Sequence, residues 1–150
     1  MLYLFIGPSC TGKAPAAEKL KTVLNADVIT GKKFIIADSD RECAFALFRK
    51  KLTDAATGNS IIYVIGDIDI VRELNVDDIA VTIRFTADLE LIKRRFATKM
   101  NGFLPDDVAK TIEKCYYEWL KYPARFVIDT TDMTATETAD SILDFLAGRS

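Results

Sequence analysis

Residues 7–14 read Gly-Pro-Ser-Cys-Thr-Gly-Lys-Ala, and this stretch decides the fold. A phosphate-binding loop has the pattern Gly-x-x-x-x-Gly-Lys followed by Ser or Thr, and Gly7, Gly12 and Lys13 match it. In such a loop, backbone N–H groups surround a phosphate at the positive end of a helix, and the lysine neutralises it. The pattern therefore predicts a site for ATP, whose expected members are Gly7, Pro8, Ser9, Cys10, Thr11, Gly12, Lys13 and Ala14.

The residue after the lysine departs from this pattern, because Ala14 stands where Ser or Thr is required. That hydroxyl normally ligates the Mg²⁺ ion that bridges the β- and γ-phosphates. Since Mg²⁺ tolerates a largely aqueous shell, a water molecule can fill the position. We therefore expect ATP and Mg²⁺ as cofactors, with nucleotide binding less affected than phosphoryl transfer. The alternative is a glycine-rich turn with a solvent-facing lysine.

The segments on either side of the loop support the first interpretation. Residues 2–6 form a short apolar run, which is typical of a buried strand. After the loop, apolar residues recur at helical spacing up to about Asn25, and Pro15 is acceptable in a first helical turn. The loop is therefore expected between a strand and a helix, as the motif requires.

The rest of the chain alternates between predicted strands and predicted helices. Further strands are expected over residues 34–37, 60–65, 79–85 and 125–129. Further helices are expected over residues 40–56, 70–74, 86–100, 104–123 and 134–146, the last opened by a capping box. This alternation predicts an α/β fold over residues 1–150 as a single domain. Its expected form is the three-layer α/β/α P-loop NTPase fold with a mostly parallel five-stranded sheet.

Candidate site residues follow the predicted strands, because ligands on parallel sheets bind at the carboxyl ends of strands. Asp67 is expected to organise the Mg²⁺ ion, which is both a metal-binding and a catalytic role. The alternative for Asp67 is a loop acid or a helix cap. Asp38, Asp40 and Arg41 are expected to bind the acceptor substrate, and the alternative for Arg41 is a surface position.

A basic cluster ends the helix predicted over residues 86–100. Arg94 and Arg95, with Lys99 beside them, are expected to form a lid over ATP that stabilises charge on the transferring phosphoryl group. Lys13, Arg94, Arg95 and Asp67 are thus the candidate catalytic residues. The alternative is a solvated face, since cations near a helix C-terminus are favourable in any case.

Composition narrows the class of protein. The chain has 49% hydrophobic and 28% charged residues and a net charge of −2, which is typical of a globular protein and argues against a nucleic-acid partner. It has no histidine and three cysteines, which indicates free thiols in a reducing cytoplasm. No apolar run is long enough for a membrane span. The expected partners are a nucleotide and a small-molecule acceptor, and a monomer and a homodimer both stay open.

With these residues placed, the chain resembles the P-loop nucleoside monophosphate kinases, and most closely the guanylate kinases. GPSCTGK (residues 7–13) is similar to their loop GPSG-x-GK, and VIGDID (64–69) resembles their strand end LxDID. ELIKRRFATK (90–99) is similar to their lid segment EL-x-RRL-x-x-R, and residues 108–132 resemble the helix, Tyr-bearing turn and final strand beside the adenine. The resemblance implies a kinase that uses ATP and Mg²⁺.

Two departures from that family bear on the acceptor. Ala14 makes the phosphate-binding loop degenerate, and residues 26–59 are too short for the β-rich acceptor-binding lobe of guanylate kinases. FIIADSDRE (34–42) is similar instead to the acid-bearing second strand of shikimate-type kinases, which have a compact acceptor domain. The expected function is an ATP-dependent phosphotransferase acting on a nucleotide or a small molecule. The alternatives are a catalytically impaired binding module of the same fold and an NTPase without an acceptor.

Overall fold

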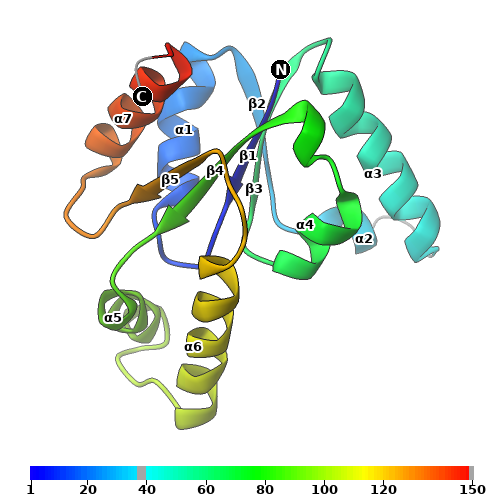
Figure 1. Cartoon of the computed structure of the whole chain (residues 1–150). Helices are drawn as coiled ribbons and strands as arrows, with labels where there is room; N and C mark the ends of the chain where they lie inside the picture. Colours follow the sequence, from blue (N-terminus) through cyan, green and yellow to red (C-terminus); the bar gives the residue numbers. More distant parts are fainter. Residues whose placement is uncertain (37–39, 149–150) are drawn as a thin grey trace.

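The computed structural model describes residues 1–36 and 40–148. One parallel five-stranded sheet forms its centre, in the order β2-β3-β1-β4-β5 (Figure 1). The strands are β1 (Leu2–Ile6), β2 (Ala26–Thr30), β3 (Ser60–Ile65), β4 (Ala80–Thr86) and β5 (Phe126–Asp129). The strand that precedes the glycine-rich loop is therefore the central strand of the sheet.

Helices cover both faces of this sheet (Figure 1). They are α1 (Lys13–Val23), α2 (Lys33–Ile36), α3 (Arg41–Ala55), α4 (Ile68–Leu74), α5 (Leu89–Lys99), α6 (Asp106–Leu120) and α7 (Ala135–Leu146), with a 3-10 turn at Asp77–Ile79. The predicted three-layer α/β/α arrangement with a parallel five-stranded sheet is confirmed.

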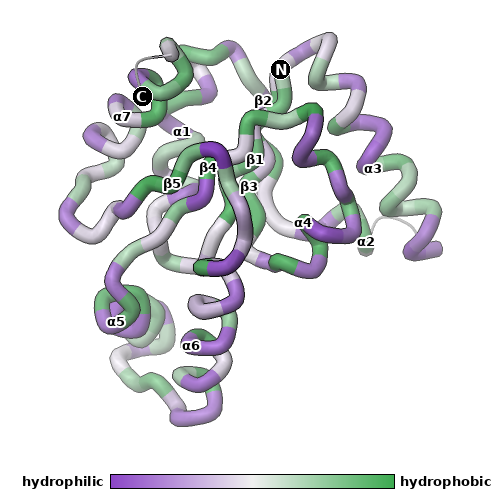
Figure 2. The backbone as a smooth tube through the Cα atoms, viewed as in Figure 1, coloured by the Kyte–Doolittle hydropathy of each residue, from purple (hydrophilic) through white to green (hydrophobic). Residues whose placement is uncertain are grey.

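Two hydrophobic clusters hold the layers together, one on each face. Leu20 of α1 and Ile142 of α7 pack with Phe5 on the first face, and all three are fully buried. Leu52 of α3 and Trp119 of α6 belong to the cluster on the second face. Figure 2 shows the inner strands as hydrophobic, whereas α3 and α6 alternate between hydrophobic and hydrophilic residues. Strands buried on both faces need such continuous apolar runs.

The second strand is the one element whose position was predicted wrongly. The strand expected over residues 34–37 is absent from the described residues, since Lys33–Ile36 forms the short helix α2. Ala26–Thr30 pairs with β3 instead. Phe34 stacks on Phe48 of α3 with ring centroids 4.1 Å apart, so its apolar side chain is satisfied by packing against a helix. A short apolar run does not by itself distinguish a strand from a buried helix.

Helices α5 and α6 extend beyond the edge where the strands end, on the side of the glycine-rich loop (Figure 1). They pack against each other, and the C-terminal part of α6 returns to the sheet. There the indole N–H of Trp119 donates a hydrogen bond to the backbone oxygen of Gly66 at 3.3 Å. No helix in the described part of the chain has the length and apolar character that crossing a membrane requires.

Candidate functional site

The glycine-rich loop connects β1 to the N-terminus of α1. Gly7 has φ 131°, and a Cβ there would lie 2.2 Å from the backbone oxygen of Phe85, so only glycine fits against β4. Gly12 and Cys10 also have positive φ angles, of 83° and 64°. Cys10 occupies a left-handed conformation that glycine adopts more readily. The similar motif GPSG-x-GK has glycine at this position.

The N-terminus of α1 is open to an anion. Gly12 caps this helix without any side-chain hydrogen bond, and its first turn carries no acidic residue. The first N–H groups of a helix have no partner within the helix and lie at its positive end. The start of α1 is therefore a place where a phosphate would be favourable.

Lys13 lies inside this loop, with only 7% of its surface exposed. Its Nζ donates hydrogen bonds to the backbone oxygens of Gly7, at 2.9 Å, and of Pro8. The pKa of Lys13 is lowered to about 7, chiefly because burial disfavours the charged form; the charge of Cys10 opposes the shift, and the charge of Lys99 adds to it. The alternative of a solvent-facing lysine is therefore wrong.

A cavity of about 320 Å³ lies over the loop, and we call it the loop cavity. Its walls include Gly12, Lys13 and Ala14 from the loop and the start of α1, and Arg95 and Lys99 from α5. Arg95 Nη1 donates a hydrogen bond to the backbone oxygen of Cys10 at 2.9 Å, so α5 is tied directly to the loop. Three cationic side chains thus face one cavity.

Arg94 differs from its neighbour, although both were predicted to close over the phosphates. It is exposed, and it is absent from the walls of the loop cavity. Successive residues of a helix do not share a face. The structure therefore brings Arg95 to the loop and leaves Arg94 on the outside of α5.

Thr130 fixes the far side of the loop and was missed by the sequence analysis. Its buried hydroxyl lies 2.8 Å from the backbone oxygen of Thr11, to which it donates a hydrogen bond. Thr11 is itself buried and donates to the backbone oxygen of Pro8 at 2.8 Å. Thr130 directly follows β5, and its position at a strand end is the signal that could have identified it.

Asp67 stands at the end of β3, where the sequence predicted it. One carboxylate oxygen, Oδ1, accepts hydrogen bonds from the N–H groups of Asp69 and Ile70 and caps α4. The other, Oδ2, forms an ion pair with Lys32 at 3.2 Å. The described residues contain no group of three or more His, Cys, Asp or Glu side chains that could hold a metal ion. The helix-cap alternative for Asp67 is thus observed, and its metal-binding role stays a prediction.

The predicted acceptor-binding residues belong to the start of α3. Asp38 lies outside the described residues. Asp40 caps α3 by accepting hydrogen bonds from the N–H groups of Glu42 and Cys43. Arg41 forms two hydrogen bonds to the carboxylate of Glu73, at 2.7 and 2.9 Å, so its guanidinium is engaged with α4.

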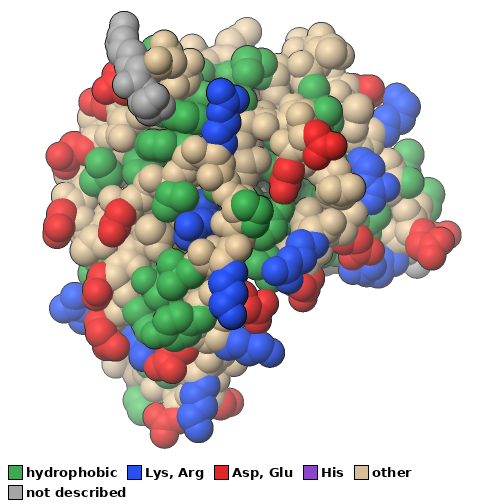
Figure 3. Space-filling model, in the orientation of Figure 1, with side chains coloured by type: hydrophobic (Ala, Val, Ile, Leu, Met, Phe, Trp, Pro, Cys, Tyr) green, Lys and Arg blue, Asp and Glu red, His purple; other side chains and the backbone are tan. Residues whose placement is uncertain are grey.

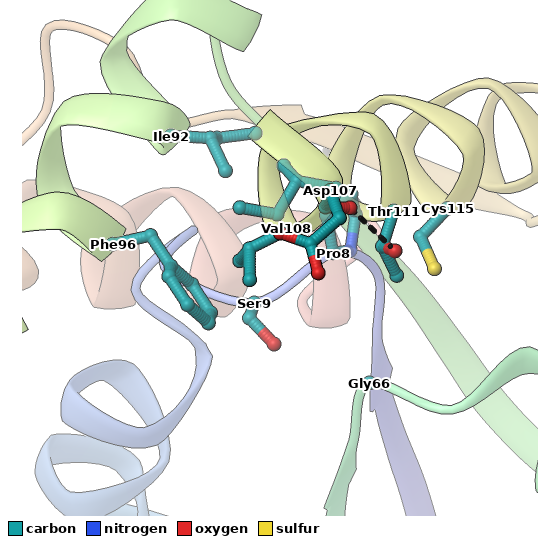
Figure 4. Close-up of a pocket in the computed structure, with 10 residues that line it drawn as sticks. Pro8, Ser9, Gly66, Ile92, Phe96, Asp107, Val108, Thr111 and Cys115 are labelled. Atoms are coloured by element: carbon teal, nitrogen blue, oxygen red, sulfur yellow. Dashed lines mark hydrogen bonds between the residues drawn. The ribbon is translucent and has the colours of Figure 1, made fainter. Parts of the chain in front are cut away.

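A second cavity, of about 300 Å³, lies between the loop, the end of β3, and helices α5 and α6. We call it the arm cavity. Figure 4 shows Phe96 of α5 and Val108 of α6 on the wall above Ser9, with Gly66 below. The remaining walls are formed by Pro8, Ile92, Asp107, Thr111, Ile112 and Cys115. None of the α6 residues was predicted from the sequence as a site residue.

The two cavities meet at Ser9, which is part of both walls. A Cβ on Gly66 would lie 3.6 Å from Ser9 Oγ and 3.9 Å from Lys13 Nζ, so the end of β3 lies directly against the loop at this junction. One cavity therefore presents cations and helix N–H groups to a phosphate. The other offers an adjoining, mostly apolar space beside the same serine.

The central strand, its glycine-rich loop and the buried lysine at the start of α1 define the fold of the P-loop kinases, and comparisons with solved structures agree. The YorR protein of Bacillus subtilis, in complex with phosphorylated GDP, is 23% identical with a TM-score of 0.70, covering 98% of this chain and 96% of that chain. The tunicamycin resistance protein of Deinococcus radiodurans is 18% identical with a TM-score of 0.73, covering 99% and 96%.

A third similar structure is the shikimate kinase of Acinetobacter baumannii in complex with shikimate. It is 16% identical with a TM-score of 0.62, and the match covers 99% of this chain and 94% of that chain. No family model matches the sequence, and no curated protein matches it. At these identities the likeness establishes the fold, and the substrates have to be inferred from the residues of this chain.

Proposed function

We propose that this chain is an ATP-dependent phosphotransferase of the P-loop kinase class that transfers the γ-phosphoryl group to a hydroxyl of a small acceptor. The observation that carries the proposal is the junction at Ser9. There a cavity with Lys13, Arg95, Lys99 and the open start of α1 adjoins a second cavity of ligand size. The loop cavity fits the β- and γ-phosphates, and the arm cavity fits the acceptor. Phosphorylated GDP in the YorR structure and shikimate in the shikimate kinase structure support the assignment of a nucleotide site with an adjoining acceptor site.

The proposed reaction requires positioning and charge neutralisation rather than a covalent intermediate. The acceptor oxygen bonds to the γ-phosphorus while the bond from that phosphorus to the β,γ-bridging oxygen breaks. ADP leaves with the electron pair, and the hydroxyl proton passes to water. Lys13 and Arg95 neutralise the oxygens of the transferring group, and the loop N–H groups hold the β-phosphate. We propose that the resemblance to guanylate kinases concerns the part of the site that binds ATP, and not the part that binds the acceptor.

Mg²⁺ is expected to accompany the nucleotide, and the protein offers it few ligands. Ala14 has no hydroxyl, and both carboxylate oxygens of Asp67 have partners. We propose that phosphate oxygens and water hold most of its coordination shell, with Asp67 contacting that shell. The ion would neutralise phosphate charge.

The test is ADP release from Mg·ATP in the presence and absence of added hydroxyl compounds. Lys13→Ala serves as the background, because it removes the buried cation of the loop. Acceptor-dependent release well above that background is the expected result. Equal ATP affinity and equal turnover in the two proteins would contradict the proposal. Release that no acceptor accelerates would indicate an NTPase.

A second candidate function is a nucleotide-binding module without catalysis. Ala14 favours it, because a methyl group replaces the hydroxyl at the metal position. This candidate predicts nucleotide binding that does not depend on Mg²⁺, together with no turnover for any acceptor. Measuring ATP affinity with Mg²⁺ and with a chelator separates it from the phosphotransferase.

A further inference from the structure

The arm cavity has an unusual charge for an acceptor site. Asp107 is the only charged side chain in its described walls, and neither Lys nor Arg contributes to them. The rest of the wall consists of apolar side chains, Gly66, Cys115 and two hydroxyls. Placing a phosphate or carboxylate there would desolvate an anion without a cationic partner, which is strongly unfavourable.

The hydroxyls do not change this conclusion. Thr111 Oγ1 donates to the backbone oxygen of Asp107 at 3.0 Å, within α6 (Figure 4). Ser9 is exposed and lies at the junction of the two cavities, where the transferring phosphoryl group is expected. The hydroxyl of Thr111 is thus already hydrogen-bonded. Ser9 is placed to contact the hydroxyl of the acceptor that receives the phosphoryl group, and not an anionic group at the other end of the acceptor.

Three cations from the α2–α3 region are engaged elsewhere. Lys32 pairs with Asp67, and Arg41 pairs with Glu73. Arg49 donates hydrogen bonds to the backbone oxygens of Glu73 and Leu74, both at 2.8 Å. These contacts fasten the α2–α3 region to α4 and the end of β3.

Arg84 is the remaining buried cation near this edge of the sheet, and it is absent from the walls of both cavities. Figure 3 shows Lys and Arg interspersed with Asp and Glu on the visible face, while hydrophobic side chains gather over α5 and α6. The wall that α5 and α6 contribute to the arm cavity is thus mostly apolar, although both helices carry charged residues elsewhere.

We propose that the acceptor of this phosphotransferase carries no negative charge: it is a neutral hydroxyl compound with an apolar or ring-shaped body that packs against Phe96, Ile92 and Val108. This inference rests on the proposed function and deepens it. A nucleoside fits the description, whereas its monophosphate does not. A neutral ester of a hydroxy acid likewise fits better than the free acid.

The test compares matched pairs that differ only in charge, namely nucleosides with their 5′-monophosphates and shikimate methyl ester with shikimate. Binding is measured by calorimetry with ADP present, and transfer is measured by acceptor-dependent ADP release from Mg·ATP. The neutral member of each productive pair is expected to bind about tenfold or more tightly than the anionic member. Equal or tighter binding of the anionic members, including absence of binding by every neutral member, would overturn the proposal.

Charge variants locate the effect in the arm cavity. Asp107→Lys is expected to reverse the preference within a pair, and Asp107→Asn to tighten the anionic member about two- to fivefold. Asp106→Asn is the matched control, because Asp106 is exposed in the same helical turn and is not part of the cavity wall. An unchanged preference in Asp107→Lys, with unfolding like that of the parent protein, would also overturn the proposal.

Failure of this inference is distinguishable from failure of the proposed function. Neutral compounds that bind preferentially but never receive phosphate would leave the charge preference standing and remove the phosphotransferase. Phosphoryl transfer to anionic acceptors alone would leave the phosphotransferase standing and remove the preference for neutral acceptors. The calorimetric and the ADP-release measurements therefore report on separate claims.

Discussion

Lys13 combines burial with a position at the start of α1, and these two properties make its charge depend on its ligand. Burial alone disfavours the ammonium form, which is why its pKa is lowered to about 7. A phosphate in the loop cavity would favour the charged form and raise the pKa again. Nucleotide binding and protonation of one side chain are therefore linked.

This linkage predicts proton uptake when nucleotide binds at pH 8. Lys13 is mostly neutral in the free protein at that pH and becomes charged in the complex, so the association constant falls as pH rises from about 7 to 9, by at most about tenfold per pH unit. Calorimetry in two buffers with different ionisation enthalpies measures the uptake. Lys99→Met removes an exposed cation of the same cavity and is expected to retain a smaller uptake, because without the charge of Lys99 the pKa of Lys13 in the free protein rises. Binding without proton uptake in the parent protein would contradict the linkage.

Ala14 is the second residue with a testable chemical consequence. It is exposed at the first turn of α1, so a larger side chain has room there. Ala14→Thr is expected to supply the missing metal ligand and raise Mg²⁺-dependent turnover by about 10–100-fold. Ala14→Val has nearly the same shape without the hydroxyl and is the control. Equal turnover of the Thr and Val variants would show that the hydroxyl is not the limiting factor.

At the scale of elements, α5 is the helix that joins the two cavities. Arg95 and Lys99 face the loop cavity, whereas Ile92 and Phe96 face the arm cavity. The spacing of these residues places both pairs on the inner side of one helix. The hydrogen bond from Arg95 to Cys10 then couples the position of α5 to that of the loop.

Adjacent arginines of α5 should therefore respond differently to substitution. Arg95→Ala is expected to lower turnover by about 100-fold, because it removes a cation that faces the transferring group. Arg94→Ala is the matched control and should change turnover little, since Arg94 is exposed on the outside of the helix. Steady-state rates at saturating ATP measure both effects. Equal losses in the two variants would contradict the assignment.

At the scale of the whole molecule, the sheet separates two hydrophobic clusters of the described residues, one on each face. Leu20 belongs to the cluster beneath α1 and α7, and Leu52 belongs to the cluster beneath α3 and α4. Each leucine is completely buried, so each face contributes its own packing energy.

Truncation of either leucine is expected to lower the free energy of unfolding by about 2–5 kcal/mol. Because the two side chains share no cluster, Leu20→Ala and Leu52→Ala should be additive within about 0.5 kcal/mol in the double variant. Urea unfolding of the four proteins measures the cycle. A larger coupling energy would mean that strain passes through the sheet between the faces.

Local sequence signals account for most of the fold but for less of the site. The phosphate-binding loop could be predicted because its glycines and its lysine occur at a fixed spacing that is specific to this kind of loop. Strand Ala26–Thr30 could not, because polar Asp27 interrupts its apolar pattern and its pairing with β3 is a tertiary contact. The arm cavity was also inaccessible to sequence reasoning, since Phe96 and Cys115 become its walls only once α5 and α6 pack together.

Trp119 gives the molecule an intrinsic fluorescence signal from a single site. It is the single tryptophan of the chain, fully buried, and its indole N–H is bonded to Gly66, which lies beside the loop and forms part of the arm cavity wall. Fluorescence excited selectively in tryptophan therefore comes from one indole, which is bonded to a wall residue of the arm cavity. We expect a ligand in the arm cavity to contact Gly66 and thereby change the surroundings of that indole, so that its emission follows binding without any attached label.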